Sequence, residues 1–129
     1  MWKRKLLAFI AVGLLLLSGR FYSNGLSRYE AYGEYCVYDT IDEEIEYTGG
    51  LVRGYDRLEV DSEEGVEQII CDLSATLIRT ESVGGAEISY YYSPNLVKKV
   101  WIGSDKISLM VAKRKGKFVI GSPLIKGSY

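Results

Sequence analysis

Apolar and polar positions divide the chain into one long apolar run at the amino end and a series of short alternating segments behind it. The run covers residues 6–18 and contains no charge, whereas Lys3, Arg4 and Lys5 precede it and Arg20 follows it. A cationic start with an apolar run of this length is typical of a secretory signal or a membrane anchor. The cations before the run predict a cytoplasmic amino terminus and an extracytoplasmic location for the rest of the chain.

The length of this run favours a cleaved signal, whereas its flanks favour an uncleaved anchor. As a helix, residues 6–18 span about 20 Å, less than the ~30 Å hydrocarbon core, which favours a cleaved signal. No Ala-x-Ala triplet follows the run, however, and Trp2 and the aromatic pair at 21–22 flank it like an interfacial belt. We therefore predict an uncleaved single-pass anchor over residues 1–22, with signal cleavage and secretion as the alternative. Residues 23–30 are the expected juxtamembrane linker.

Short β-prone segments dominate the remaining domain, residues 31–129. Residues 76–83 and 86–92 flank two glycines, which is a strong signal for a tight hairpin. Residues 99–102 and 107–114 flank a four-residue turn and predict a second hairpin. Further strands are expected at 31–39, 51–60 and 118–120, and the proline at 123 places the last segment at an edge or past the sheet.

One helix is expected in this domain, at about residues 62–74. Asp61 is the predicted N-cap, and Glu64 three residues later completes a capping-box spacing. Four apolar residues follow at the period of a helix with one buried face: Val66, Ile69, Ile70 and Leu73. The pattern therefore predicts an α+β fold, with one helix packed on a mostly antiparallel sheet of about 5–6 strands.

Composition and charge refine this picture. Hydrophobic residues make up 47% of the chain and there are only 2 prolines, which favours a packed domain over a disordered tail. Residues 30–72 carry a formal net charge of −12 and residues 73–129 one of +6. We expect the two halves to pack together and partly neutralise each other. The alternative is a basic face that contacts an anionic lipid or polymer.

The chain contains only two cysteines, Cys36 and Cys71. A disulfide between them would close a loop of about 35 residues and stabilise the fold by about 3 kcal/mol in the entropy model. Two cysteines do not form a disulfide framework, so we favour two buried or partly buried thiols over a bridge.

Histidine is absent from the chain, which excludes Ser-His-Asp and Cys-His catalysis and every histidine-containing zinc site. No phosphate-binding glycine motif occurs, and we predict no catalytic residue, no metal and no cofactor. Carboxylates are dense between residues 39 and 67, and we interpret them as a solvated surface. An acid–base pair or a calcium site among them is the minor alternative.

Two groups of side chains are candidates for contacts with other molecules. The first is basic and surrounds a predicted turn: Lys113, Arg114, Lys115 and Lys117, with 98–99 and 126 as further lysines. Turn lysines that protect a sheet edge explain this group, and anionic surface contact is the functional alternative. The second is Tyr90 and Tyr92, which share one face of a predicted strand. Core packing explains them, and a binding surface is the alternative.

Three segments near the carboxyl end, at 89–96, 107–112 and 121–129, carry a weak resemblance to known proteins. They read Ser-Tyr-Tyr-Tyr-Ser-Pro-Asn-Leu, Ile-x-Leu-x-Val-Ala and Gly-Ser-Pro-Leu-Ile-x-Gly-Ser-Tyr. Together with the short apolar run at the amino end, they resemble small uncharacterised membrane-anchored proteins of spore-forming Firmicutes that are similar to the YwmB group. The resemblance implies a Gram-positive envelope context and brings no catalytic residue.

These observations predict a membrane-tethered extracytoplasmic domain that is not an enzyme and acts as an interaction module of the cell envelope. The expected partner is an envelope protein or polymer, and nucleic acid is excluded as a partner by this location. The alternative is a secreted or anchored small-ligand-binding module in which the helix and sheet form a pocket lined by tyrosines.

Overall fold

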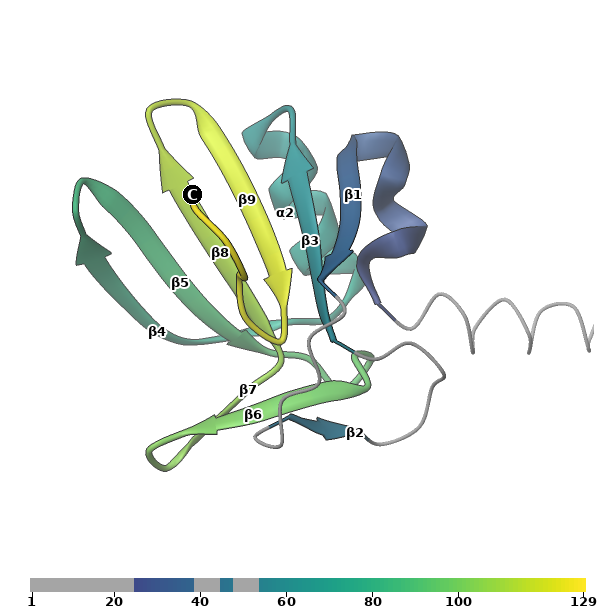
Figure 1. The fold of residues 1–129 in the computed structure, drawn as a ribbon, viewed down its shortest axis with the longest axis vertical. Coiled ribbons are helices and arrows are strands. Elements are labelled where there is room, and N and C mark those ends of the chain that lie inside the picture. Colours follow the sequence, from purple (N-terminus) through teal and green to yellow (C-terminus); the bar gives the residue numbers. More distant parts are fainter. Residues whose placement is uncertain (1–24, 39–44, 48–53) are drawn as a thin grey trace, which may run out of the picture.

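The computed structural model describes residues 25–38, 45–47 and 54–129 (Figure 1). The predicted anchor at 1–22 lies outside these residues, and so do the acidic residues at 39–44. No helix within the described ranges has both the length and the apolar character needed to cross a bilayer.

Six strands form one antiparallel sheet in the order β1-β3-β9-β8-β5-β4. The fold is therefore α+β with a six-stranded antiparallel sheet, as predicted. The strands of this sheet are β1 (Gly33–Tyr38), β3 (Tyr55–Val60), β4 (Thr76–Val83), β5 (Ala86–Tyr92), β8 (Leu109–Arg114) and β9 (Lys117–Ser122).

The chain builds this sheet from two antiparallel units. β1 and β3 pair with each other, and β4, β5, β8 and β9 form a meander that ends beside β3. The predicted hairpin of β4 and β5 is confirmed, with Val83 opposite Ala86 across the two glycines.

Helix α2 (Glu63–Asp72) connects β3 to the far edge strand β4 and confirms the predicted helix. Its N-cap differs from the prediction by one residue. The Ser62 hydroxyl, and not the Asp61 carboxylate, accepts the hydrogen bond from the backbone N–H of Gly65, at 3.1 Å. Serine and aspartate are equally good caps, so the sequence spacing alone does not distinguish two adjacent candidates.

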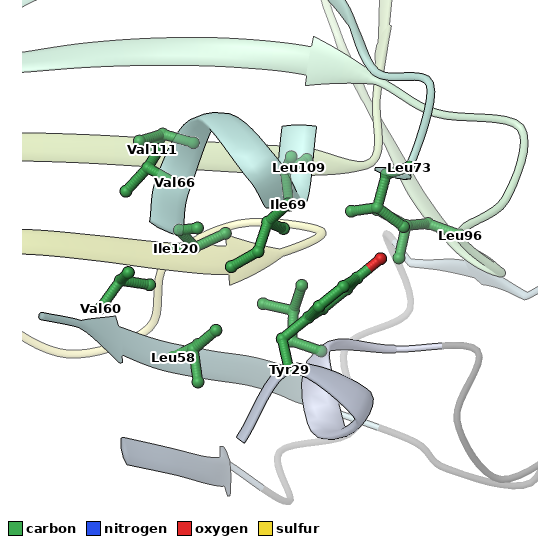
Figure 2. Packing of buried hydrophobic residues seen from close by; sticks show 11 residues of the cluster. Tyr29, Leu58, Val60, Val66, Ile69, Leu73, Leu96, Leu109, Val111 and Ile120 are labelled. Atoms are coloured by element: carbon green, nitrogen blue, oxygen red, sulfur yellow. The ribbon is translucent and has the colours of Figure 1, made fainter. Parts of the chain in front are cut away.

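The main hydrophobic core lies between α2 and the sheet. The predicted apolar stripe supplies Val66, Ile69 and Leu73, each 0% exposed, while Ile70 is partly buried at the margin. Figure 2 shows Val66 and Ile69 directed at side chains from the strands, and Leu73 beside Leu96. Those strand residues include Leu58, Val60, Leu109, Val111 and Ile120. Leu58 and Val60 therefore share the face of β3 that is directed at α2.

Part of the other face of the sheet is covered by a small sheet and by the end of the chain. The small sheet has the order β2-β6-β7, with β2 (Glu46–Tyr47), β6 (Lys98–Ile102) and β7 (Asp105–Ile107). The buried residues on this face form a second hydrophobic cluster. Residues 124, 125 and 129 of the carboxyl-terminal segment pack against this cluster, and the segment runs in front of β8 in Figure 1. The sheet is thus covered on both faces near its centre.

The second predicted hairpin is wrong in its extent. We predicted one long strand at 107–114, but the chain changes sheets at Ser108. β7 before it pairs with β6, and β8 after it pairs with β5. Ser108 is buried, and its hydroxyl accepts a hydrogen bond from the Ser93 backbone N–H, at 2.7 Å. This contact holds the crossing point between the two sheets.

The amino-terminal end of the described chain is packed, although we predicted a linker at residues 23–30. Residues Leu26–Tyr32 form a 3-10 helix, η1. Leu26 is 0% exposed and Tyr29 5%, and both belong to the main core. The packed domain thus includes part of the predicted linker, because two apolar residues in a polar segment are sufficient to anchor one short helical turn.

The opposite charges of the two halves meet in the folded domain. Lys98 pairs with Asp56 at 2.9 Å, Lys113 with Glu63 at 3.0 Å and Lys117 with Glu59 at 3.7 Å. Each pair joins a residue of the acidic half to one of the basic half. Two of the pairs are partly exposed and contribute little to stability, whereas the pair of Asp56 and Lys98 is buried.

Cys36 and Cys71 are both free and both exposed. The prediction of buried or partly buried thiols is therefore wrong. Cys36 lies on the edge strand β1 and Cys71 near the end of α2, on the side of the helix that faces solvent.

Candidate functional site

Strand β4 is the most exposed strand of the six-stranded sheet. Seven of its eight residues are exposed and the eighth, Glu81, is partly buried. In Figure 1 the β4–β5 hairpin lies at the left, away from α2. The helix lies behind the sheet, near β3 and β9. Within the described part of the chain, β4 pairs only with β5. Its outer edge therefore presents backbone donors and acceptors to an incoming strand.

Two local features shape this strand. Gly84 and Gly85 both have positive φ angles, 57° and 81°, which is the geometry of a type I′ hairpin turn. At the other end, the register between β4 and β5 shifts between Leu77 and Arg79, so that Ile78 occupies a bulge. The bulge lies directly beside the pocket described next.

An open apolar pocket of about 330 Å³ lies between β4 and the β6–β7 hairpin. Ile78, Tyr92 and Trp101 supply its apolar lining, and residues 104–106 complete it. Trp101 and Leu77 are each 54% exposed, and Ile78 is 39% exposed. We call the outer edge of β4 together with this pocket the β4 groove.

Polar contacts hold the aromatic rings of the groove in place. The Trp101 indole N–H donates to a Glu46 carboxylate oxygen at 3.2 Å. The Lys106 ammonium lies 5.6 Å from the Trp101 ring centroid and 5.9 Å from that of Tyr92, and the Lys99 ammonium lies 5.4 Å from the latter. The groove thus presents exposed aromatic surface next to positive charge.

Tyr90 and Tyr92, the two predicted binding-surface residues, have different surroundings. Tyr90 is 8% exposed, its hydroxyl donates to Glu81 at 2.6 Å, and the Arg79 guanidinium lies 5.1 Å from its ring centroid. This side chain is part of the core opposite α2. Tyr92 is partly buried and lines the open pocket. Of the two, only Tyr92 reaches the groove.

The four predicted basic residues lie together at the β8–β9 turn, and three of them have partners within the domain. Lys113 donates to Glu63, a contact that raises the pKa of its ammonium, and Lys117 pairs with Glu59. The Arg114 guanidinium donates to the Tyr129 carbonyl oxygen at 3.4 Å. Lys115 is exposed in the turn, where its φ is 46°. The two further lysines at 98 and 99 are buried and are not part of this surface.

A second pocket, of about 340 Å³, lies beside the β8–β9 turn, where β9 begins. Its lining includes three carboxylates, from Glu34, Glu59 and Asp61, together with Lys117. Glu59 already accepts a hydrogen bond from Arg57 at 3.1 Å and pairs with Lys117. The Glu59 carboxylate therefore already has two cationic partners within the domain.

Asp56 and Lys98 form a buried ion pair that lines neither of the two pockets described above. They are 1% and 2% exposed, and the Lys98 ammonium lies 2.9 Å from one Asp56 oxygen. The Leu26 backbone N–H donates to the other oxygen at 3.0 Å, and the Tyr35 hydroxyl donates to the first at 3.2 Å. The pair connects η1, β1, β3 and β6, so we assign it a structural role.

Burial raises the pKa of Tyr29 and of Tyr90 to about 12, and hydrogen bonds to Asp72 and Glu81 act in the same direction. Because the folded state prefers the neutral phenol, this contribution to stability is complete below pH 10 and is lost as the pH rises towards 12. We expect the free energy of unfolding to fall between pH 10 and 12. Urea unfolding at several pH values should show a smaller fall in the Tyr29→Phe/Tyr90→Phe variant than in the parent. An equal fall in both would contradict this assignment.

Within residues 25–38, 45–47 and 54–129, no three histidine, cysteine or acidic side chains are grouped closely enough to hold a metal ion. The acidic residues at 39–44, which carry most of the calcium alternative, lie outside these ranges, and Glu46 is the hydrogen-bond partner of Trp101. Comparisons of the chain with family models, with curated proteins and with solved structures found no match.

Trp101 and Ile78 were not among the residues predicted from the sequence, although one signal for Trp101 was present. Val100 and Trp101 are adjacent in a short strand, and adjacent side chains of a strand point to opposite faces. An apolar Val100 directed at the core therefore places Trp101 on the outer face, and the structure shows Val100 3% and Trp101 54% exposed. The bulge that exposes Ile78 has no comparable signal in the sequence.

Proposed function

We propose that this chain is a non-enzymatic interaction module of the cell envelope, tethered to the membrane by residues 1–22, with the folded domain on the extracytoplasmic side. The module binds an extended segment of a protein partner at the β4 groove. The segment adds a strand to β4, and one of its apolar side chains enters the pocket of Ile78, Tyr92 and Trp101. The observation that carries this proposal is the exposure of β4 and Trp101 next to one another.

Two physical arguments support strand addition as the mode of binding. An exposed edge strand offers a row of backbone hydrogen bonds, and pockets for alternate side chains beside it provide specificity. Large aromatic side chains are enriched where proteins bind one another. Trp101 and Tyr92, which line the open pocket, meet this description.

The chemistry of the described residues supports a role in binding more than in catalysis. The chain has no histidine, and burial moves the pKa values of Tyr29 and Tyr90 further from neutrality. A general acid or base works best with a pKa near the working pH. These tyrosines therefore remain neutral hydrogen-bond donors under physiological conditions.

Site-specific photo-crosslinking of the full chain in its producing cell tests the proposed surface. A photoreactive residue in place of Leu77 or Trp101 should form adducts with a protein. The control positions are Val37, which is an exposed apolar residue of the edge strand β1, and Gln68, which is exposed on α2. Equal labelling at all four positions, or no protein adduct at Leu77 and Trp101, would overturn the proposal.

Fractionation combined with amino-terminal sequencing tests the tether. We expect the chain in the membrane fraction with its terminus before residue 22, and its folded domain accessible to protease from outside. Release into the medium with a new terminus near Leu26 would show a secreted protein instead.

A small-ligand-binding module is the second candidate. The observation in its favour is the volume of the groove pocket, about 330 Å³, which lies at the lower end of the range of known ligand sites. If the chain binds small aromatic probes, and the Trp101→Ala variant does not, while no protein adduct forms at Leu77, this second function replaces the first.

A further inference from the structure

The sequence of β4 is complementary to itself around Thr80. When two copies of this strand run antiparallel with the two Thr80 residues opposite each other, Arg79 of each copy lies opposite Glu81 of the other. Directly opposite residues of an antiparallel pair point to the same face of the sheet. Two pairs of opposite charges and one threonine pair therefore meet in this register.

The backbone of β4 presents the correct hydrogen-bonding groups for this pairing. In a two-residue type I′ hairpin, the closing pair, here Val83 and Ala86, exchanges both of its backbone hydrogen bonds. Because the pattern alternates, Glu81 and Arg79 also direct their N–H and C=O groups towards β5. Ser82 and Thr80 direct theirs outward. A register centred on Thr80 pairs these outward groups. A register centred on Glu81 would also use them, but it places the two Glu81 carboxylates opposite each other, where like charges repel.

The apolar surface of the β4 groove is self-complementary as well. Val83 is 47% exposed and shares with Ala86 and Tyr90 the face of the sheet opposite α2. Tyr92 lies two residues after Tyr90 and therefore points to that same face. The groove pocket that Tyr92 lines is on this face as well, at the opposite end of β4 from Val83. The two-fold arrangement brings Val83 of each copy beside Ile78 of the other. Each copy thus contributes one projecting side chain and one pocket.

We propose that the partner of the β4 groove is a second copy of this chain, an inference that rests on the proposed function of that groove. The two-fold axis is perpendicular to the sheet, and the two six-stranded sheets join into one continuous sheet through their β4 strands. Both α2 helices lie on the same face of the joined sheet. Such an interface is isologous and closes after two copies.

Charged residues and bulges on edge strands usually prevent strand pairing, and β4 has both. Their effect depends on the pattern of the charges. Edge lysines repel an identical strand, whereas Arg79 and Glu81 on either side of a central residue attract one. The bulge at Ile78 limits the regular pairing to residues 79–81, and Ile78 at the bulge lines the pocket that receives Val83.

A charge-exchange experiment on the full chain tests this inference. In the Arg79→Glu variant the facing residues are all acidic, and in Glu81→Arg they are all basic. Sedimentation in density-matched detergent should show twice the mass of one chain for the parent and a single chain for each variant. An equimolar mixture of the two variants, and the double variant, should again show two chains. A variant chain that does not fold cannot produce this recovery, so recovery also controls for folding. Monomers in all five samples would overturn the proposal.

Thiol cross-linking tests the register. Cys36 and Cys71 are first replaced by serine, and a cysteine is then placed at Thr80 or, as the matched control, at Ser82. In the proposed register the two Thr80 positions are about 5.5 Å apart, whereas the two Ser82 positions are four residues apart along the strand, roughly 13 Å. A short thiol cross-linker should join Thr80→Cys chains at least tenfold more efficiently than Ser82→Cys chains. The reverse order would overturn the register.

The outcomes distinguish this inference from the proposed function. If Thr80→Cys chains do not cross-link and the parent is a monomer, while photoreactive Leu77 and Trp101 still capture a different protein, self-pairing is overturned and the proposed function stands. If neither position captures any protein, both are overturned.

Discussion

The Asp56→Ala substitution is expected to lower the free energy of unfolding by about 3–5 kcal/mol, the usual cost of removing one partner of a buried ion pair. The Lys98 ammonium would remain 2% exposed with its charge partner gone. The Leu26 backbone N–H and the Tyr35 hydroxyl would also lose their acceptor. Because domains of this size are stable by only about 5–15 kcal/mol, a large part of the stability would be lost.

Lys98→Met is the matched substitution on the other side of the pair. It removes the charge but keeps an apolar side chain of similar length, and the Asp56 carboxylate retains two hydrogen-bond donors. We therefore expect a smaller loss than in Asp56→Ala. In Asp56→Ala/Lys98→Met no charge is buried, so this variant should be more stable than the sum of the two single effects predicts.

Urea unfolding of all these variants in the same detergent, followed by circular dichroism, measures the differences. A loss below about 1 kcal/mol in Asp56→Ala, or strict additivity in the double variant, would show that the pair does not hold η1 and β6 to the sheet.

The Ile69→Ala substitution is expected to lower the free energy of unfolding by about 2–5 kcal/mol, because it removes buried methyl groups and leaves a cavity. Ile69 is 0% exposed and lies at the centre of the contact between α2 and the sheet (Figure 2). Leu58 and Ile120 belong to the same cluster on the strand side. The rigid sheet on one side of the cavity limits how far the surroundings can collapse.

Gln68→Ala is the control for this substitution. Gln68 is the neighbouring residue of the same helix, is exposed, and has a helix propensity close to that of alanine. Its replacement should change the free energy of unfolding by less than about 0.5 kcal/mol. Similar losses in the two variants would mean that α2 does not depend on its buried face. The same urea titration provides both values.

The elements that the sequence predicts well are those whose signals are local. The spacing of Val66, Ile69 and Leu73 defines the helix, and the two glycines at 84–85 define the first hairpin. Both patterns depend on residues within one or two turns of each other. The capping residue was wrong by one position because Asp61 and Ser62 have nearly equal capping strength.

The errors concern contacts between residues that are distant in the sequence. Leu26 and Tyr29 lie in a polar segment, and their burial depends on the surface that β3 and α2 offer them. Ser108 interrupts an apolar run because the chain there leaves one sheet for another. Lys98 looked like a surface lysine, and only its distance to Asp56, 42 residues earlier in the chain, explains its burial.

The candidate site was predicted only in part. Tyr92 was a candidate from the sequence and lines the β4 groove, while Tyr90 on the same face is covered by Glu81 and Arg79. Alternation along a strand identifies which side chains share a face, but burial of that face depends on what packs over it. Here the β6–β7 hairpin ends beside Tyr92 and exposes Trp101.

The sequence by itself determined the absence of histidine chemistry, the helix and the first hairpin, because composition and short-range periodicity carry that information. The tertiary structure alone decided that β4 is an edge strand, that Ile78 and Trp101 form one pocket with Tyr92, and that Asp56 and Lys98 meet in the interior. These features depend on strand order and on the bulge in β4. Strand order results from packing among segments far apart in the chain, where context outweighs local propensity.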